Sequence, residues 1–323
     1  MSLGAFLLMA ASLFAAEPSV AKAKPPEPPV FLTVAAAGAD FLLQGEFTAK
    51  GLGANSIALG GDPYRLVLFT GGLPGAGWDG SAREELEGSR QDKQVIFTSK
   101  TGKAHATLLD GNLQVTRADG TEGTLQRVIR RSPTEGATAP AGAKILFDGK
   151  DAKAWKGGKV DERGFLRCGT SSVEKFRDYT LHLEFMLPFT PFARGQSRAN
   201  SGVYHQDRYE VQVLDSFGLK GMNNECGGIY TVSAPKVNMC FPPLQWQTYD
   251  VEFTAARFGA DGQRTAWARI TVRHNGVLIQ ENVDLPRTTT SSGINTITDT
   301  PGPFQLQEHG NPVYYRNIWV LEK

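Results

Sequence analysis

The sequence predicts an all-β protein, and three observations support this. Short β-prone runs recur between turns, and the chain contains 36 glycines and 18 prolines. Apolar and polar residues alternate along Tyr179–Leu187, as on a strand with one buried face. No stretch of useful length shows helical periodicity. Closely spaced strands without long helices indicate a sandwich or jelly roll of two packed antiparallel sheets.

Length and composition narrow the class of protein. The 323 residues suffice for two domains, or for one large β domain with an appendage. The chain is 41% hydrophobic and 21% charged, which is typical of a soluble globular protein. Its net charge of +1, without a dense basic stripe, argues against nucleic acid as a partner.

The N-terminus predicts export. An apolar run, Leu3–Phe14, is too short to span a bilayer but has the length of a signal-peptide core, and Ala21-Lys22-Ala23 follows as a cleavage pattern. We therefore expect a signal peptide at residues 1–23 and a periplasmic, cell-surface or extracellular protein without a transmembrane span in the mature chain. The alternative is a buried first helix.

Two linkers divide the rest of the chain. A proline-rich linker at residues 24–30 is expected to stay extended. Residues 31–131 contain short β-prone runs and predict a small all-β domain, in which we find no catalytic constellation. The second linker, residues 132–143, combines Pro, Gly, Ala and Thr without periodicity, so the boundary to the main β domain, residues 144–323, belongs there.

The stretch NSGVYHQDRYEVQVLDS carries the first candidate site. Its two strand-like runs, Ser201–His205 and Tyr209–Leu214, flank a short turn and predict a hairpin. The side-chain period of two places Glu210 and Gln212 on one face, while Asp215 shares the other face with the apolar residues. This polar face is either solvated or functional.

The second candidate site lies near the C-terminus, in FQLQEHGNPVYYRNIWV. Gln307 and His309 share one strand face, and Glu308 is expected near the rim of the sheet. Arg316 is predicted to share a face with Ile318, where it needs a carboxylate partner or a solvent-filled cleft. The alternative is an arginine that reaches the sheet edge.

A long irregular loop, Asn223–Pro243, is expected to wall a cleft over the sheet. It holds two of the three cysteines, Cys226 and Cys240, which we expect to form a disulfide if the chain is exported; Cys168 is the third. The spacing of cysteines and histidines excludes a structural zinc ribbon or finger.

Together these segments offer side chains suited to sugar binding, to holding a divalent cation, or to proton transfer. The set comprises Glu210, Asp215, Glu308, His205, His309, Gln212, Gln307 and Arg316.

At these residues the chain resembles the 3-keto-disaccharide hydrolase domain family, DUF1080, which has a concanavalin-like jelly-roll fold. The motifs that carry the resemblance are ILFDGKDAKAW (Ile145–Trp155), the NSGVY and YEVQVLDS pair, CGGIY (Cys226–Tyr230) and LQEHGNPVYYRNI (Leu306–Ile318). The family more often has LQDHG, so Glu308 is a conservative departure. Residues 31–131 are not covered.

The resemblance implies cleavage of glycosides whose glucose unit carries a ketone at C3. A base removes the acidified C2 proton, the enolate expels the aglycone from C1, and water adds to the unsaturated sugar. We assign proton transfer to His309 and regard Glu210 as a second base or metal ligand. Arg316 is expected to pair with Glu210, with Glu308 or with the enolate oxygen, and Glu308 completes the catalytic set.

Substrate binding is assigned to Gln212, Asp215, Gln307, His205 and Tyr230. No cofactor is certain, and a divalent cation stays an option. The alternative function is a non-catalytic, lectin-like carbohydrate-binding module. An ordinary glucanase is disfavoured, because no strand carries two closely placed glutamates.

Overall fold

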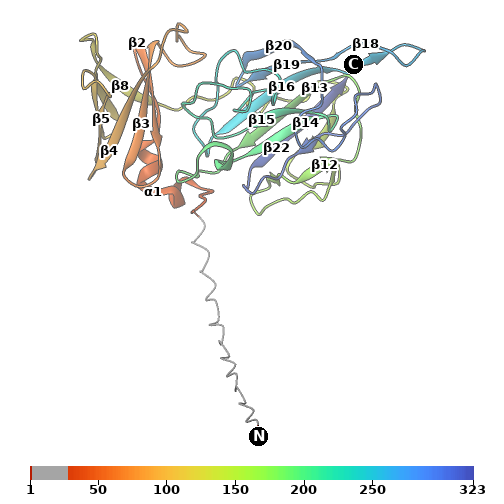
Figure 1. Cartoon of the computed structure of the whole chain (residues 1–323), viewed down its shortest axis with the longest axis horizontal. Helices are drawn as coiled ribbons and strands as arrows, with labels where there is room; N and C mark the ends of the chain where they lie inside the picture. The colour runs from red at the N-terminus through yellow and green to blue at the C-terminus, as the bar shows by residue number, and fades with distance from the viewer. Residues whose placement is uncertain (2–27) are drawn as a thin grey trace.

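The computed structural model describes Met1 and residues 28–323. It contains a closed eight-stranded barrel followed by a sandwich of a five-stranded and a seven-stranded antiparallel sheet (Figure 1). The all-β prediction, with a small β domain before a two-sheet sandwich, is confirmed. The predicted signal peptide, residues 1–23, and residues 24–27 of the first linker lie outside the described residues, Met1 apart. No helix in the described part is long and apolar enough to cross a membrane.

The barrel strands pair in chain order, and β1 closes on β8. Its interior is a packed apolar core that includes the fully buried Phe47, Leu66 and Phe97, so it is filled rather than hollow. The strands are β1 (Gly45–Ala49), β2 (Gly51–Ala58), β3 (Pro63–Gly71), β4 (Glu84–Gln91), β5 (Gln94–Thr98), β6 (His105–Leu109), β7 (Asn112–Thr116) and β8 (Glu122–Val128).

A helix that the sequence did not predict, α1 (Val34–Leu43), precedes the barrel, and its Ala37 enters the barrel core. Thr33 caps it by accepting a hydrogen bond from the backbone N–H of Ala36. Gly38 has a φ of 66° and interrupts the helix. A ten-residue helix interrupted in this way shows too little periodicity to be recognised.

The sandwich core lies between the inner faces of its two sheets. The five-stranded sheet has the order β10 (Trp155–Lys156), β12 (Thr170–Ser172), β21 (Gln305–Leu306), β14 (Ser201–His205) and β15 (Tyr209–Val213). The larger sheet contains β11 (Leu166–Arg167), β22 (Tyr314–Glu322), β13 (Tyr179–Met186), β16 (Trp246–Thr254), β19 (Ala268–His274) and β20 (Val277–Leu285), with β9 (Lys144–Phe147) on β22. A short ribbon of β17 (Arg257–Phe258) and β18 (Arg264–Ala266), and the 3₁₀ turn Gly195–Ser197, complete the described elements.

A β-bulge at Asn317 reverses the predicted orientation of Arg316. The pairing of β22 with β13 shifts register here, and Asn317 has a φ of 46°. The extra residue leaves Ile318 and Val320 in the core while Arg316 points to the opposite, outer face. The expectation that Arg316 shares a face with Ile318 is therefore wrong.

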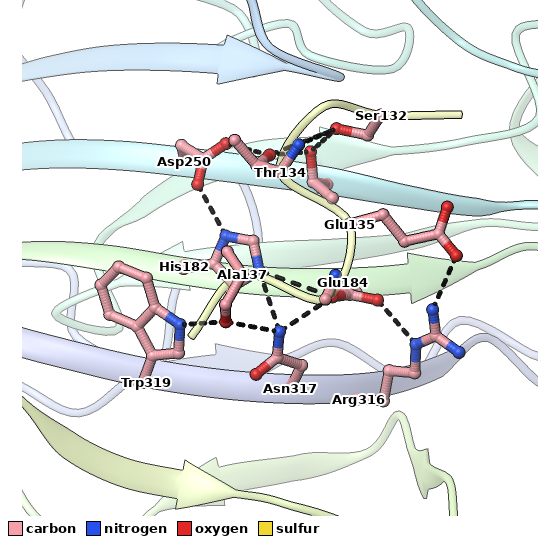
Figure 2. A network of polar contacts seen from close by, with 12 residues as sticks. Ser132, Thr134, Glu135, Ala137, His182, Glu184, Asp250, Arg316, Asn317 and Trp319 are labelled. Atoms are coloured by element: carbon pink, nitrogen blue, oxygen red, sulfur yellow. Dashed lines mark hydrogen bonds and ion pairs between the residues drawn. The ribbon is translucent and has the colours of Figure 1, made fainter. Parts of the chain in front are cut away.

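The second linker packs on the outer face of the larger sheet. We call residues 132–137 the strap. Gly136 donates its backbone N–H to Glu184 at 2.6 Å, and the carbonyl of Ala137 accepts from Asn317 at 3.1 Å (Figure 2). The strap covers β13, so His182 and Glu184 are buried on the face that alternation had predicted to be exposed.

Candidate functional site

Three neighbouring strands carry the candidate site. In the hairpin, Tyr204 pairs with Glu210 and Gly202 pairs with Gln212, and β21 lies along the other edge of β14. The backbone N–H of Gln307 donates to the carbonyl of Gly202 at 2.9 Å. Alternation then places the side chains of these residues on the outer face of the five-stranded sheet, while the apolar residues between them face the core.

These side chains line a cavity of about 120 Å³, which we call the amide pocket. Five sequence-predicted site residues meet there, although they come from three separate segments of the chain. The lining residues are Gln196, Asn200, Glu210, Gln212, Tyr230, Thr290, Ser291, Gln307 and His309.

Glu210 is the buried carboxyl group of the pocket and is only 3% exposed. Burial raises its pKa to about 7, although the hydroxyl of Tyr204, which donates to Oε2 at 2.9 Å, acts in the opposite direction. Oε1 lies over Gly202, where a Cβ atom would collide with it. A carboxyl group with this pKa can both take up and release a proton near neutral pH.

Tyr204 can serve both protonation states of Glu210. Its hydroxyl lies 2.9 Å from Glu210 Oε2 and 2.6 Å from the carbonyl of Thr290, and it has one proton to donate. The proton can point to the ionised carboxylate, or to Thr290 when Glu210 is protonated and donates to the tyrosine oxygen. Burial raises the pKa of Tyr204, so this hydroxyl keeps its proton.

The pocket also contains buried acceptors without partners. Asn200 is 2% exposed; its Nδ2 donates to the carbonyl of Gln196 at 2.8 Å, but its Oδ1 has no hydrogen bond to any described residue. Gln307 Oε1 is likewise buried and has no hydrogen bond to any described residue. Unpaired buried acceptors are unfavourable, and ligand hydroxyl groups would satisfy them.

A wider groove of about 420 Å³ adjoins the amide pocket and shares Ser291, Gln307 and His309 with it. Glu308 lines this groove rather than the pocket itself. Glu308 Oε2 lies 3.5 Å from Cys168 Sγ, and the Glu308 side chain is 43% exposed. The two hollows together can accommodate a sugar and the group attached to it.

The irregular loop walls the pocket as predicted. Its CGGIY segment pairs with the free edge of β15: the N–H of Gln212 donates to the carbonyl of Gly228 at 2.9 Å, and the N–H of Tyr230 donates to that of Glu210 at 3.2 Å. Gly228 approaches the carbonyl of Asn223 so closely that a Cβ atom would collide with it.

His205 does not line the amide pocket, contrary to the sequence-based assignment. It lies on the inner face of β14, is fully buried, and contacts the hydroxyl of Tyr179 through Nδ1 at 3.0 Å. Its ring stacks on Phe253, and burial lowers its pKa to about 3. The alternation of the strand directs His205 into the core because Tyr204 faces the pocket.

Asp215 also lies away from the amide pocket. It follows β15 and is 2% exposed. Its Oδ2 accepts from Arg198 Nε at 2.7 Å, and its Oδ1 accepts from the backbone N–H of Phe217 at 3.3 Å. Since the chain has left the strand here, the period of two no longer determines its direction.

Arg316 lies on the other sheet and does not pair with Glu210 or Glu308 as expected. Its guanidinium donates to Glu184 at 2.6 Å and to Glu135 of the strap at 2.9 Å (Figure 2). Burial alone would raise the pKa of Glu184, but hydrogen bonds from His182, Asn317, Gly136 and Arg316 outweigh it and lower this pKa to about 2. These residues therefore lie on the larger sheet under the strap and not at the amide pocket.

The predicted disulfide is absent from the structure. Cys226, Cys240 and Cys168 are buried free thiols. Cys226 and Cys240 are nevertheless neighbours, and burial together with the adjacent Cys226 thiol raises the pKa of Cys240. Cys226 Sγ also lies 3.2 Å from the hydroxyl of Tyr249 in the sandwich core.

Within the described residues, no group of three or more His, Cys, Asp and Glu side chains has the arrangement of a metal site. A divalent cation in the amide pocket would have to use the carboxylate of Glu210 together with the unpaired amide oxygens of Asn200 and Gln307. Such oxygen donors suit a hard cation and equally suit sugar hydroxyl groups.

A hollow of about 500 Å³, larger than the amide pocket, lies elsewhere, on the outer surface of the barrel. Strands β6 to β8 form it, with His105, Gln114 and Glu122 among the lining residues. Neither a buried carboxyl group nor an unpaired buried acceptor is found among its lining residues in the described chain. We therefore place the candidate site in the sandwich.

Sequence reasoning missed several residues that line the pocket or contact its carboxyl group. Tyr204 could have been found: with three turn residues after His205, the hairpin pairing sets Tyr204 opposite Glu210. Gln196, Thr290 and Ser291 come from irregular loops, and nothing in their local pattern indicates the pocket.

Comparison with known proteins covers the sandwich. A family model described as the 3-keto-alpha-glucoside-1,2-lyase-like domain matches residues 142–321. The crystal structure of a candidate glycosyl hydrolase from Parabacteroides distasonis ATCC 8503 is similar: 35% identity over 58% of this chain and 86% of that chain, with a TM-score of 0.53. Two further candidate glycosyl hydrolases from this organism are 18% and 17% identical, cover 56% of this chain and 94% and 99% of their own, and have TM-scores of 0.42 and 0.39. No curated protein matches the chain.

Proposed function

Because the chain belongs to the 3-keto-alpha-glucoside-1,2-lyase-like domain family, we propose that it is an enzyme that cleaves the glycosidic bond of 3-keto-glycosides. The family and the 35% identical candidate glycosyl hydrolase support a carbohydrate-active role. The observation that carries the proposal is Glu210, a buried carboxyl group with a pKa of about 7 beside unpaired amide oxygens.

Glu210 is the general base in this proposal. A ketone at C3 acidifies the C2 proton, and Glu210 Oε1 removes it while Tyr204 donates to Oε2. The C2–H electron pair forms an enolate with its negative charge on the C3 oxygen. When the carbonyl re-forms, the electron pair moves to the C1–C2 bond as the C1–O bond breaks. The products are an unsaturated 3-keto sugar and the free alcohol, and addition of water to the double bond then gives the 3-keto sugar.

Two residues that follow β21, Gln307 and His309, supply the hydrogen-bond donor and the acid that the reaction needs. Gln307 Nε2, which already donates to the hydroxyl of Tyr204 at 3.2 Å, has a second N–H for the C3 oxygen as negative charge develops there. His309 lies at the junction of pocket and groove, where it can protonate the leaving oxygen. The proton-transfer role assigned to His309 from the sequence is therefore proposed to be that of the acid.

We also propose that the sugar ring occupies the amide pocket and the aglycone occupies the groove lined by Glu308. The unpaired oxygens of Asn200 and Gln307 would accept from sugar hydroxyl groups. Export remains part of the proposal, and the support for it is the apolar run Leu3–Phe14 with its following cleavage pattern.

The test is to incubate the protein with a 3-keto-glucoside and with its unoxidised parent, each with and without a chelator. We expect aglycone release from the 3-keto-glucoside only, and a loss of kcat by a factor of about 10² or more in Glu210→Gln. Loss of activity in chelator would assign the pocket oxygens to a cation. A hydrogen label at C2 should exchange with solvent during turnover.

A lectin-like module is the alternative from another class. It predicts that the wild type binds the sugar but releases aglycone from neither substrate, and that result would overturn the enzymatic proposal. Cleavage of the unoxidised parent alone would indicate an ordinary glycosidase.

A further inference from the structure

The barrel contacts a loop that lines the amide pocket, and this gives the barrel a place in the site. We call residues 189–200, between β13 and β14, the pocket loop. Phe189, at its start, is fully buried and belongs to the barrel core. It exchanges backbone hydrogen bonds with Phe31 at 3.0 and 2.9 Å and packs edge-on against Phe41 of α1. The other end of the loop, Asn200, lines the pocket.

Arg198 joins three segments through one guanidinium. It is 6% exposed, and its Nε donates to Asp215 Oδ2 at 2.7 Å. Nη2 donates to the carbonyl of Ala58, the last residue of barrel strand β2, at 3.3 Å, and Nη1 donates to the carbonyl of Pro191 at 3.2 Å. The buried Arg198–Asp215 ion pair therefore connects the end of β2, the pocket loop and the segment that follows β15.

The side chains that reach the pocket lie two residues to either side of Arg198. Gln196 Oε1 accepts from Gln212 Nε2 at 3.0 Å and from Asn200 Nδ2 at 3.2 Å. A shift of Arg198 would therefore move Gln196 and release both amides from their present orientation. Asn200, which lines the pocket, would then lose its present orientation.

The barrel also holds the loop that follows Asp215. Phe217 packs in a buried cluster with Ile57 and Phe69 of the barrel, and Arg83 donates to the carbonyl of Leu219 at 2.7 Å. The barrel therefore packs against segments on both sides of the Arg198–Asp215 ion pair and is not joined to the sandwich by the linker alone.

We propose that the barrel is a positioning element of the sugar site, which holds the pocket loop so that Gln196 and Asn200 orient the ligand, and that Arg198 is the positioning residue. The substrate named in the kinetic test below rests on the proposed function. The structural part of the inference does not depend on it.

The first test uses the full chain without any sugar. Amide hydrogen exchange is measured in Arg198→Met and in Phe41→Ala, a barrel substitution remote from the pocket. We expect exchange in residues 190–200 to rise at least tenfold in both variants. The matched controls, Arg257→Met at the ion pair with Asp178 and Leu42→Ala on the exposed side of α1, should leave this segment unchanged. Unchanged exchange in Phe41→Ala would overturn the proposal, even if Arg198→Met fails to fold.

The second test is kinetic and uses a 3-keto-glucoside. Both variants should raise KM about tenfold and keep kcat, per folded active site, within about twofold, because the loop binds but does not react. Adding Gln196→Ala to Arg198→Met should raise KM little further, since both act on one network. If Arg198 and Phe41 only stabilised the fold, the variants would have a lower folded fraction and an unchanged KM, and that result would contradict the proposal. An inactive wild type would refute the proposed function, while hydrogen exchange would still decide this inference.

Discussion

Tyr204 and Glu210 lie directly opposite each other on β14 and β15, and the tyrosine hydroxyl donates to Glu210 Oε2 at 2.9 Å. Burial raises the pKa of Glu210 to about 7, and this hydrogen bond limits the increase. The pair therefore determines the pH at which the proposed base becomes available.

Tyr204→Phe should shift the pH dependence of the reaction. Without the hydroxyl, no hydrogen bond to Oε2 opposes the effect of burial, so the pKa of Glu210 rises. The acid limb of the plot of kcat/KM against pH then moves to higher pH by about one unit. Tyr314→Phe, outside the pocket, should leave the limb in place. A limb that stays put or moves to lower pH in Tyr204→Phe would contradict the assignment of Glu210 as base.

Glu210 should destabilise the fold at neutral and higher pH. Because its folded pKa of about 7 lies above the usual 4.5, the native state binds the proton more tightly than the unfolded chain. Stability is thus lost as pH rises from about 4.5 through 7, by about 3 kcal/mol in total. Glu210→Gln should equal the wild type in unfolding free energy near pH 4 and exceed it at pH 8. Urea unfolding at both pH values measures the difference, and a variant less stable at pH 8 would contradict the pKa.

Gly202→Ala should remove activity while the protein stays folded. The added Cβ would occupy the place of Glu210 Oε1, so the carboxylate must turn away from the pocket. We expect kcat to fall by a factor of about 10², comparable to loss of the base. Circular dichroism and Tm check the fold. Gly123→Ala, on β8, is the control for the glycine substitution itself, because its φ is not positive and an added Cβ would meet only ordinary contacts at 3.7 and 3.9 Å. Full activity in Gly202→Ala would place the reacting group elsewhere.

His309 should matter most when the leaving group is poor. If it protonates the leaving oxygen, His309→Ala should lower kcat/KM about 10²-fold for an alkyl 3-keto-glucoside. For a nitrophenyl 3-keto-glucoside, whose leaving group departs as an anion, the loss should be less than tenfold. An equal loss for both substrates would indicate a binding role instead.

Glu184→Gln should lower stability without changing the chemistry. Glu184 is fully buried among charged and N–H donors, and a hydrogen-bonded carboxylate with a pKa of about 2 contributes about 3 kcal/mol. This contribution is present above pH 4.5 and is lost as pH falls toward 2, so the difference in urea unfolding should shrink in acid. Glu174→Gln, a half-exposed ion pair with Lys144, should change stability by less than about 1 kcal/mol. KM for the sugar should stay the same in both variants.

The sequence predicted the sandwich and the location of the pocket because both depend on strand periodicity. Alternation in Tyr209–Val213 correctly separated Glu210 and Gln212 from the core residues. The same rule applied across the turn would have added Tyr204 and excluded His205.

What the sequence could not predict depends on irregular backbone. A single inserted residue at Asn317 moved Arg316 to the other face, and no residue pattern marks that bulge. Asp215 was assigned to substrate binding although alternation put it on the apolar face, and its ion pair with Arg198 lies after the strand has ended at Val213. Gln196 and Ser291 reach the pocket only through loops that the rest of the fold positions.

The strap has a consequence for where this molecule can be divided. The family match begins at residue 142, but Gly136, Glu135 and Ala137, which satisfy Glu184, Arg316 and Trp319, lie before it. A fragment cut at the family boundary would expose these buried polar groups to water. A fragment meant to keep these hydrogen bonds should therefore begin before the strap and not at residue 142.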